Sequence, residues 1–453
     1  MKFLITGATG LLGRELGIKL VRQGHEVHVI TRQGEASRQH LPFPCRIFQG
    51  DLSREVMELS EVYDGVFHLM GEPVAEGRWN PEKKKSLVDS RVVATRNLRQ
   101  SLRQSPRVLM AASAIGFYGH RGEEELDEHS PVGAGFLAEL CENWETEVSA
   151  FSSGTRKIVL RIGIVLAEQG GALAQMIPLF QKSLGAPLSS GQQWMSWIHL
   201  QDVVEMFWWS FKNSQVQGVL NAVAPKPLRN IEFTQSLAQA LGTHRIPRVP
   251  GVVLKTLYGE MGSVVLASQK VLARKSLDLG FQFQFSDLES ALKDVCALWR
   301  DGHGVLKVAQ FFSSTPAEVF PFFSDARNLQ KITPEQLHVR ILSVNPEPLQ
   351  SGTLIDYRLR IRGIPVYWRT RIENWQPPHQ FVDTQLRGPY VSWHHTHRFE
   401  EIPGGTLMTD VVRYKLPVGL VGRWVAGAFV RSDVEKIFDF RRRSCHSLFS
   451  KNF

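Results

Sequence analysis

The segment KFLITGATGLLG, residues 2–13, decides the fold of the first part of the chain. An apolar run over 2–6 is followed by three glycines spaced three apart and then by a helical pattern. Such glycines let the backbone approach a pyrophosphate, while the N–H groups of the helix N-terminus point at its charge. A tight turn that serves packing alone is the alternative. We expect a dinucleotide site at the turn residues Gly7, Thr9, Gly10, Leu11, Leu12 and Gly13.

The end of the next strand, residues 26–31, indicates which dinucleotide binds. An acidic residue there would hydrogen-bond the adenosine ribose 2′-hydroxyl and select NAD, whereas an arginine accommodates a 2′-phosphate. The strand is followed by Arg32, and no Asp or Glu occurs before Glu35. Arg14 and Arg38 add positive charge nearby. A solvated loop residue is the alternative for Arg32, but the missing carboxylate favours NADP over NAD.

Length and composition limit the class of protein. The chain of 453 residues is long enough for two domains, each with its own core. It begins directly with a core strand and has no apolar run of the roughly 18 residues that a span requires. We therefore expect no signal peptide and no integral membrane segment. The distant Cys45, Cys141, Cys296 and Cys445 favour a reduced, cytoplasmic protein without disulfides or a thiolate zinc site.

The net charge of +9 is concentrated in the last third of the chain. Residues 305–453 hold 20 Lys and Arg against 13 Asp and Glu. A basic domain can bind nucleic acid or an anionic surface, but these arginines form no dense tract. We expect a solvated basic surface and no nucleic-acid partner.

Short apolar strands alternate with helical stretches over the first 300 residues, which predicts a parallel sheet covered on both faces. The expected strands are 2–6, 26–31, 45–49, 65–70, 107–113, 157–166 and 218–223. A helix over 287–299 ends this part. The Gly-rich segment 301–304 is the expected boundary between a domain 1–300 and a domain 305–453.

The pattern changes to antiparallel strands after this boundary. The expected elements are a strand 305–312, two short helical pieces within 315–332, strands 338–344, 353–362, 365–375, 379–386, 391–400 and 405–415, and a helix from about 422 to 449. This order predicts a curved sheet wrapped round the last helix, with a cavity between them. Arg358, Arg360 and Arg362 share one face of their strand, and we expect the opposite face, with Tyr357 and Leu359, to line the cavity.

Several motifs resemble those of the extended short-chain dehydrogenase/reductases, in particular the YfcH-type epimerase branch. They are ITGATGLLGRELGIKL (5–20), SAIGFYG (113–119), FLAELCENWE (136–145), LRIGIVLAEQGGAL (160–173) and GQQWMSWIHLQDVV (191–204). The segments IDYRLRIRGIPVYWRT (355–370) and GPYVSWHHTHRF (388–399) are similar to START/Bet v1-type (SRPBCC) domains. The resemblance implies an α/β Rossmann doubly wound parallel sheet with a small substrate-binding lobe. An α+β helix-grip domain of the SRPBCC type follows.

The resemblance also implies further cofactor contacts. Asp51 and Leu52 match an Asp-Leu pair that contacts adenine, and Leu69 and Gly71 match the strand end that passes the nicotinamide ribose. A cap on a helix beginning near Ser53 is the alternative for Asp51.

The acid–base pair of the resembling family is missing. Short-chain reductases use Tyr-x-x-x-Lys, in which the lysine lowers the pKa of the tyrosine. The matching region 133–145 offers Phe136, Leu137, Leu140 and Cys141 instead. Ser113 matches the serine that polarises a substrate oxygen. Tyr118 is the nearest candidate for proton transfer, with a pocket-lining role as the alternative.

Three more residues are candidates with structural alternatives. Arg161 could contact a phosphate of the cofactor or substrate, or form an ion pair. Trp197 and His199 lie where the family places its substrate-binding segment, and His199 could donate a proton or be hydrogen-bonded within the structure.

Histidines at 394, 395 and 397 raise the question of a metal. Strand alternation places His395 and His397 on one face with Trp393. No Cys, Asp or other third ligand stands at a suitable spacing, so we expect no metal site.

These observations predict an NADP-dependent oxidoreductase or epimerase that acts on an unknown small molecule. The second domain would hold an apolar ligand. Two alternatives remain, a non-catalytic NADP sensor or scaffold of the cell-division-inhibitor type and a carrier of lipid or another apolar metabolite. The sequence does not indicate the oligomeric state.

Overall fold

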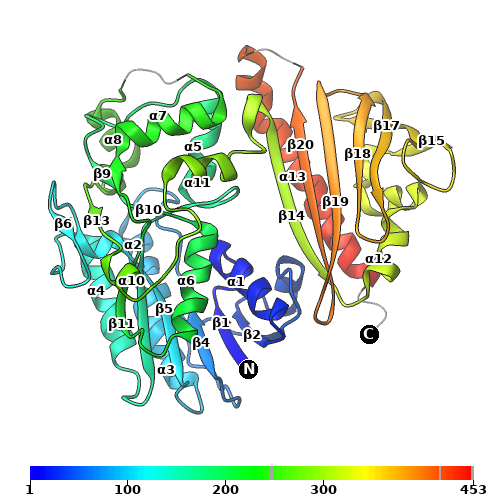
Figure 1. Cartoon of the computed structure of the whole chain (residues 1–453). Helices are drawn as coiled ribbons and strands as arrows, with labels where there is room; N and C mark the ends of the chain where they lie inside the picture. Colours follow the sequence, from blue (N-terminus) through cyan, green and yellow to red (C-terminus); the bar gives the residue numbers. More distant parts are fainter. Residues whose placement is uncertain (245–247, 418–419, 450–453) are drawn as a thin grey trace. The chain divides into compact units, whose positions relative to one another are not determined.

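The computed structural model describes residues 1–244, 248–417 and 420–449 (Figure 1). The chain divides into two compact units, each built on its own sheet. The first unit comprises Met1–Glu35 and Cys45–Ala297, and the second comprises Ala36–Pro44 and Leu298–Phe453. The contact-based division thus falls after Ala297, a few residues before the Gly-rich segment 301–304.

The sheet of the first unit has seven parallel strands within the described residues. Their order is β11 (Gly218–Ala222), β7 (Arg156–Ile162), β5 (Val108–Ala114), β4 (Gly65–His68), β1 (Lys2–Thr6), β2 (Glu26–Thr31) and β3 (Arg46–Gln49). The chain adds strands outward from β1 in both directions, so the topological switch point lies between β1 and β4. Ligands bind outside the carboxyl ends of the strands at such a point.

Helices cover both faces of this sheet. On one face α1 (Leu11–Arg22) packs against α6 (Leu200–Lys212), and on the other α3 (Ala94–Ser101) packs against α4 (Phe136–Ser149). Helix α2 (Pro81–Val88) leads into α3 through a π-helical turn, Asp89–Val93. Because both faces are covered, all four residues of β4 are buried. The expected α/β doubly wound sheet is confirmed.

The expected strand 157–166 is divided. Strand β7 ends at Ile162, and β8 (Ile164–Leu166) leaves the sheet to pair with β10 (Trp197–His199). The break falls at Gly163, where a Cβ atom would lie 2.6 Å from the carbonyl oxygen of Ser196. The smaller elements beyond the sheet are α5 (Gly171–Gln181), α7 (Asn230–Leu241), α8 (Gly251–Tyr258), α9 (Met261–Val265), α10 (Arg274–Asp278), α11 (Leu288–Val295), β6 (Glu125–Leu126), β9 (Trp194–Met195), β12 (Leu228–Arg229) and β13 (Lys270–Val271).

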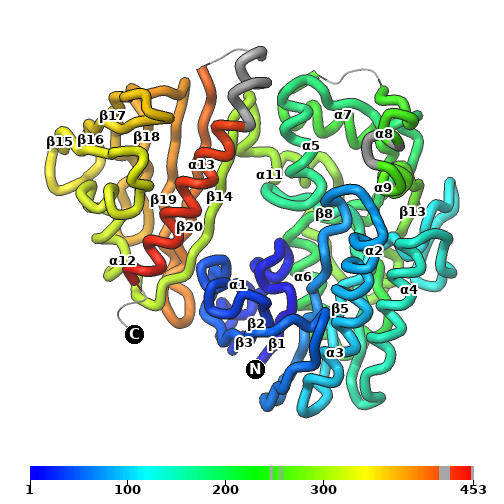
Figure 2. Tube along the Cα trace, turned by 180° about the vertical axis from the view of Figure 1, so that it is seen from behind, coloured from blue at the N-terminus to red at the C-terminus, as the bar shows by residue number. Residues whose placement is uncertain are grey.

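The second unit holds a seven-stranded antiparallel sheet in the part of the chain that the structure describes. Its order is β14 (Gly304–Phe312), β20 (Gly405–Lys415), β19 (Ser392–Ile402), β18 (Gln380–Arg387), β17 (Ile364–Gln376), β16 (Leu354–Ile361) and β15 (Arg340–Asn345). The long helix α13 (Leu420–Phe449) runs along one face of the sheet (Figures 1 and 2). Helix α12 (Pro316–Phe323) and a 3-10 helix (Ala326–Ile332) follow β14. This arrangement confirms the expected α+β domain.

The faces of β16 are divided only in part as the alternation predicts, because Arg360 and Arg362 also line the cavity. Tyr357 and Leu359 line the cavity between sheet and helix, whereas Arg358 is exposed. The placement of Arg362 in this strand is wrong. Arg362 (φ +51°) and Gly363 (φ +83°) form the two-residue turn between β16 and β17, and positive φ at both positions suits a hairpin turn.

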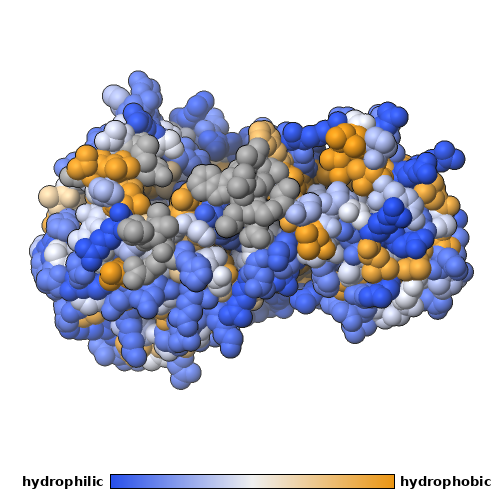
Figure 3. Space-filling view, turned by 90° about the horizontal axis from the view of Figure 1, so that it is seen from above, coloured by the Kyte–Doolittle hydropathy of each residue, from blue (hydrophilic) through white to orange (hydrophobic). Residues whose placement is uncertain are grey.

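None of the described helices is long and apolar enough to cross a membrane. The face in Figure 3 is mainly hydrophilic, and its hydrophobic patches are separated by hydrophilic side chains. Scattered apolar side chains are normal on protein surfaces. The polar groups that point to function lie instead inside the two units.

Candidate functional site

The glycine turn after β1 is in close contact with the end of β4. Gly7 has φ +74°, and a Cβ atom there would lie 2.8 Å from the backbone of Leu69 and Met70. A Cβ atom at Gly13 would lie 2.4 Å from the carbonyl oxygen of Gly7. Both positions therefore exclude a side chain. The structure brings Leu69, expected beside the nicotinamide ribose, against the turn expected to bind the pyrophosphate.

The helix that follows the turn has an N-terminus suited to an anion. Gly10 is the N-cap of α1 and supplies no side-chain cap, and the first turn contains no acidic residue. Thr9 is exposed, and Leu11 and Leu12 are partly exposed. The first N–H groups of a helix lack intrahelical partners and carry partial positive charge. The residues present therefore fit a dinucleotide diphosphate.

Two arginines near this turn have no assigned partner. Arg32 is exposed at the end of β2, and Arg14 is partly exposed on α1. Neither side chain has a hydrogen bond or ion pair within the described part of the chain. Burial lowers the pKa of the Arg14 guanidinium. An anionic group placed here would compensate this desolvation.

The expected adenine contacts lie in a turn rather than before a helix. Asp51 Oδ1 accepts hydrogen bonds from the backbone N–H of Ser53 (3.1 Å) and from its hydroxyl (2.6 Å). The residues from Ser53 onward form a turn, so the alternative of a helix cap is wrong. Leu52 is buried, and its carbonyl oxygen accepts from Asn97 Nδ2 at 2.8 Å. Asp51 is thereby oriented by its own loop.

Gly71 lies beside a partly buried cation. A Cβ atom at Gly71 would lie 2.9 Å from the guanidinium of Arg91, which belongs to the π-helical turn. The guanidinium donates to the carbonyl oxygens of Glu72 (3.0 Å) and Leu87 (3.3 Å), and burial lowers its pKa. π-Helical turns often occur at functional sites. The strand end expected at the nicotinamide ribose thus carries positive charge.

A row of polar side chains crosses three neighbouring strands near their carboxyl ends. Ser113 on β5 stands opposite Arg161 on β7, and Arg161 stands opposite Asn221 on β11. Glu145, from α4, joins this row and completes a buried network. Its carboxylate accepts from Ser113 Oγ (2.7 Å) and, at two oxygens, from Arg161 Nε (3.0 Å) and a terminal nitrogen (2.8 Å). Arg161 therefore forms an ion pair within the protein, which was the alternative to a contact with a phosphate.

Tyr118 is part of the same network. The residue is fully buried, its hydroxyl donates to Asn221 Oδ1 at 2.7 Å, and it accepts from Arg161 at 3.0 Å. Burial raises the pKa of Tyr118 to about 12. Because the hydroxyl is occupied and enclosed, we infer a positioning role for Tyr118 rather than proton transfer.

The face of α4 toward Ser113 carries Cys141 and Glu145, one helical turn apart. Burial raises the pKa of the Cys141 thiol to about 11. Glu145, which the sequence analysis did not single out within the region 133–145, has a carboxylate in contact with Ser113. The i, i+4 spacing of the two residues on a helix was the available signal. Their common target, Ser113, could be found only from the fold.

Trp197 and His199 are buried, and the polar atoms of both side chains contact groups within the protein. Trp197 Nε1 donates to the carbonyl oxygen of Lys226 at 3.2 Å. His199 is the N-cap of α6, where its Nδ1 accepts from the N–H of Gln201 at 3.1 Å. Its Nε2 lies 3.2 Å from the carboxylate of Asp294.

The second unit contains the expected cavity. Its volume is about 500 Å³, and it lies between the sheet and α13. Its walls are mainly apolar and include Leu359, Trp368, Phe381, Tyr390 and Ile437. Most ligand pockets have this composition, with a few polar groups that orient the ligand.

Three family models match successive parts of the chain. Residues 3–222 match the NAD dependent epimerase/dehydratase family. Residues 249–295 match a domain of unknown function, DUF1731. Residues 313–440 match the family described as polyketide cyclase / dehydrase and lipid transport.

Relatives match about two thirds of the chain. The epimerase family protein SDR39U1 homolog, chloroplastic, of Arabidopsis thaliana is 39% identical over 303 residues, which cover 65% of this chain and 86% of the relative. SDR39U1 of Mus musculus is 34% identical over 304 residues, or 66% of this chain and 100% of the relative. A crystal structure of human SDR39U1 (isoform 2) with NADPH is 30% identical with a TM-score of 0.59, covering 66% of this chain and 99% of that chain.

Proposed function

The chain belongs to the NAD dependent epimerase/dehydratase family, with relatives named SDR39U1, and from this we propose that it is an NADP-dependent oxidoreductase or epimerase of small molecules. The main observation in support is the hydrogen bond from Ser113 Oγ to the Glu145 carboxylate at 2.7 Å. It supplies an acid–base group where the Tyr-x-x-x-Lys pair is missing. The substrate is a small compound with a carbonyl or hydroxyl group.

NADP binding is supported by three features of the first unit. The turn with Gly7 and Gly13 permits close approach of a diphosphate, and the N-terminus of α1 lacks a side-chain cap. Arg32 and Arg14 provide cations for a 2′-phosphate or the diphosphate. The related human protein was crystallised with NADPH. NADP(H), when bound, supplies or accepts the hydride.

In the oxidation direction, the proton of a substrate hydroxyl passes to Ser113 Oγ while the proton of Ser113 passes to Glu145. Reduction reverses these transfers after Glu145 has taken a proton from solvent. Arg161 orients the carboxylate, since it donates to both of its oxygens. Tyr118 holds Arg161 from the other side.

Nucleotide titration tests the cofactor. The wild-type protein should bind NADPH more tightly than NADH. Losing an arginine–phosphate contact costs about 1.5–3 kcal/mol, so Arg32→Ala should weaken NADPH tenfold or more and leave NADH nearly unchanged. Arg103→Ala, at an exposed arginine after α3, is the matched control. Equal wild-type affinities for the two nucleotides would contradict the proposal.

Turnover tests the proton transfer. With a substrate found among aldehydes, ketones and quinones, Glu145→Gln and Ser113→Ala should each lower kcat by about 10²–10⁴ without weakening NADPH. Tyr118→Phe should have a smaller effect on kcat. If the wild-type protein binds NADPH but turns over none of these compounds, the non-catalytic sensor is the better account.

The cavity of the second unit supports a second role, the binding of an apolar ligand. Its mainly apolar walls enclose about 500 Å³, which suits a drug-sized molecule. Mass spectrometry of organic extracts from the purified full chain tests this role. A bound apolar molecule that Leu359→Trp displaces would support it, and an equal yield from the two proteins would argue against it.

A further inference from the structure

Four titratable side chains lie together on the adjacent strands β18, β19 and β20, and three of them line the cavity of the second unit. His395 and His397 lie two residues apart on β19, so they share the face toward the cavity. In the strand register, Asp383 on β18 stands opposite His395, and Asp410 on β20 stands opposite His397. Both histidines are at least 95% buried. We call these four residues and Arg441 the histidine cluster.

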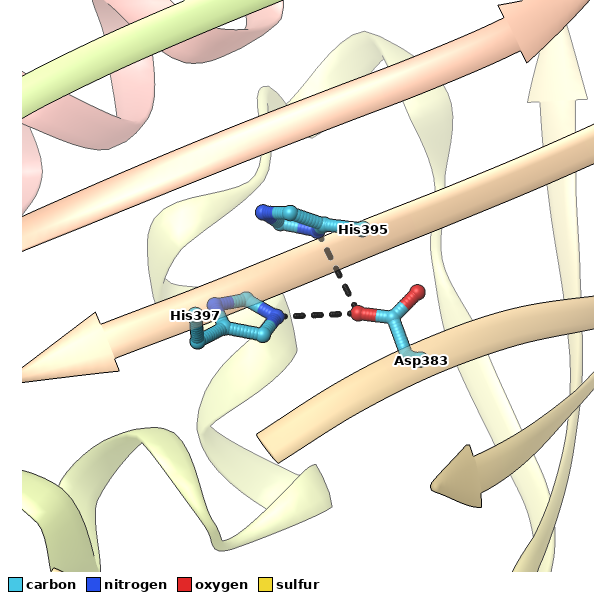
Figure 4. Close-up of side chains that lie close together, drawn as sticks. All are labelled: Asp383, His395 and His397. Carbon is cyan, nitrogen blue, oxygen red and sulfur yellow. Dashed lines mark hydrogen bonds and ion pairs between the residues drawn. The ribbon is translucent and has the colours of Figure 1, made fainter. Parts of the chain in front are cut away.

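Three ligand atoms of this cluster lie close together. Asp383 Oδ2 is 3.2 Å from His395 Nδ1 and 2.9 Å from His397 Nε2, and both contacts meet at the same carboxylate oxygen (Figure 4). The three atoms lie within 4.8 Å of one another. Metal–ligand bonds of about 2.0–2.2 Å place neighbouring ligand atoms at similar separations. We propose that Asp383, His395 and His397 bind a divalent transition-metal ion such as Zn²⁺.

Asp410 prepares both histidines for this role. Its Oδ1 lies 3.0 Å from His395 Nε2 and 2.8 Å from His397 Nδ1, the ring nitrogens that do not face Asp383. Metal-binding histidines usually donate their other ring N–H to such an acceptor, which fixes the tautomer and the ring orientation. One carboxylate thus turns a lone pair of each imidazole toward Asp383.

Arg441, on α13, holds Asp410 in turn. Its Nε lies 3.4 Å from Asp410 Oδ2. Asp383 contacts the two histidines and Asp410 pairs with Arg441, so two carboxylates lie at this mainly apolar cavity with one arginine beside them. Buried charge without compensation is costly, and a divalent cation bound to Asp383 would compensate it.

The proposed site leaves coordination positions open toward the cavity. Three protein ligands with nitrogen and oxygen donors are typical of open metal sites, whereas structural zinc sites have four protein ligands. The open positions take water or an oxygen atom of a ligand. The site therefore selects apolar molecules that carry a carbonyl, hydroxyl or carboxylate group, whose oxygen reaches the metal while the rest contacts the apolar walls.

Metal titration of the full chain tests the proposal. After treatment with EDTA and its removal, calorimetric titration should show one Zn²⁺ per chain with a dissociation constant below the micromolar range. Co²⁺ at the same site should give visible d–d absorption that Zn²⁺ abolishes, without a thiolate charge-transfer band. Absence of binding at micromolar Zn²⁺ would overturn the proposal.

Variants test which side chains bind the metal ion. His395→Ala and the nearly isosteric Asp383→Asn should abolish the Co²⁺ spectrum, and Asp410→Asn should weaken binding by about 10–100-fold. His394→Ala is the matched control, because His394 is exposed on the opposite face of the same strand. A spectrum that survives Asp383→Asn, or that His394→Ala abolishes, would overturn the assignment. If His395→Ala fails to fold, Asp383→Asn alone decides.

Discussion

The two units each bury a cluster of charges, and the clusters differ in the groups that balance them. In the Ser113 cluster (Ser113, Tyr118, Glu145 and Arg161), one carboxylate is paired with one arginine through two hydrogen bonds. In the histidine cluster, Arg441 pairs with Asp410, and two imidazoles lie between Asp410 and a second carboxylate, Asp383.

The two clusters differ in whether they can take up a proton or a metal ion. In the Ser113 cluster one carboxylate is matched by one guanidinium, so its geometry is held before any ligand arrives, as preorganised sites require. The histidine cluster lacks one positive charge when its imidazoles are neutral. It can gain that charge from a proton or a metal ion, which makes its occupancy depend on the surroundings.

Breaking the ion pair between Arg161 and Glu145 in the Ser113 cluster should have the largest effect on stability. Arg161→Ala leaves Glu145 buried without its partner and should lower the free energy of unfolding of the first unit by about 3–5 kcal/mol. Hydrogen exchange of the amides of β5 and β7 measures the loss. Arg274→Ala, which removes an exposed pair with Glu125, should cost less than about 1 kcal/mol. Similar losses in the two variants would show that burial does not strengthen the inner pair.

Nucleotide binding should separate the two units. At a concentration about 100 times its dissociation constant, NADPH should stabilise the first unit by about 2.7 kcal/mol. Exchange of the amides of β1 and β4 should slow accordingly, while those of β18, β19 and β20 stay unchanged. Protection of β19 by NADPH would show that the two clusters are coupled.

Removing the arginine of the histidine cluster should cost less than removing Arg161. Arg441→Ala should lower the stability of the second unit by about 1.5–3 kcal/mol, because both imidazoles remain in contact with Asp410. Exchange of the amides of β19 and β20 reports this loss. A cost as large as that of Arg161→Ala would contradict the distinction between the clusters.

The first unit also contains a buried histidine that lacks carboxylate partners. His68 lies between the hydroxyls of Thr6 (2.8 Å) and Thr95 (2.9 Å), and burial lowers its pKa to about 3. Below a pH of about 6.5 the unfolded chain takes up a proton that the folded unit does not. Stability should therefore be constant above that pH and fall by about 1.4 kcal/mol per pH unit below it.

Urea unfolding at pH 7 and pH 5.5 measures this dependence. His68→Gln should flatten it, whereas His129→Gln, at an exposed histidine, should leave it unchanged. An unchanged slope in His68→Gln would show that other groups set the acid sensitivity of the first unit.

Several features could be predicted because they depend on neighbours in the chain. The glycine turn after β1 requires a positive φ at Gly7 and a residue without Cβ at Gly13, and both needs arise from neighbours in the chain. Alternation along β16 likewise separated Tyr357 and Leu359 from Arg358. The predictions failed at Arg362 and around Ser53, since turn boundaries depend on hairpin geometry and on hydrogen bonds that periodicity does not reveal.

The members of the two clusters are brought together only by the tertiary structure. The sequence by itself determined the succession of most strands along the chain, the absence of the Tyr-x-x-x-Lys pair and the shared face of His395 and His397. Only the folded chain brings Glu145 to Ser113, 32 residues apart, and Asp383 to His395 through the register of two strands. The physical reason is that hydrogen bonds and metal sites act over about 3 Å, whereas sequence patterns specify which face a side chain occupies but not which distant side chain it meets.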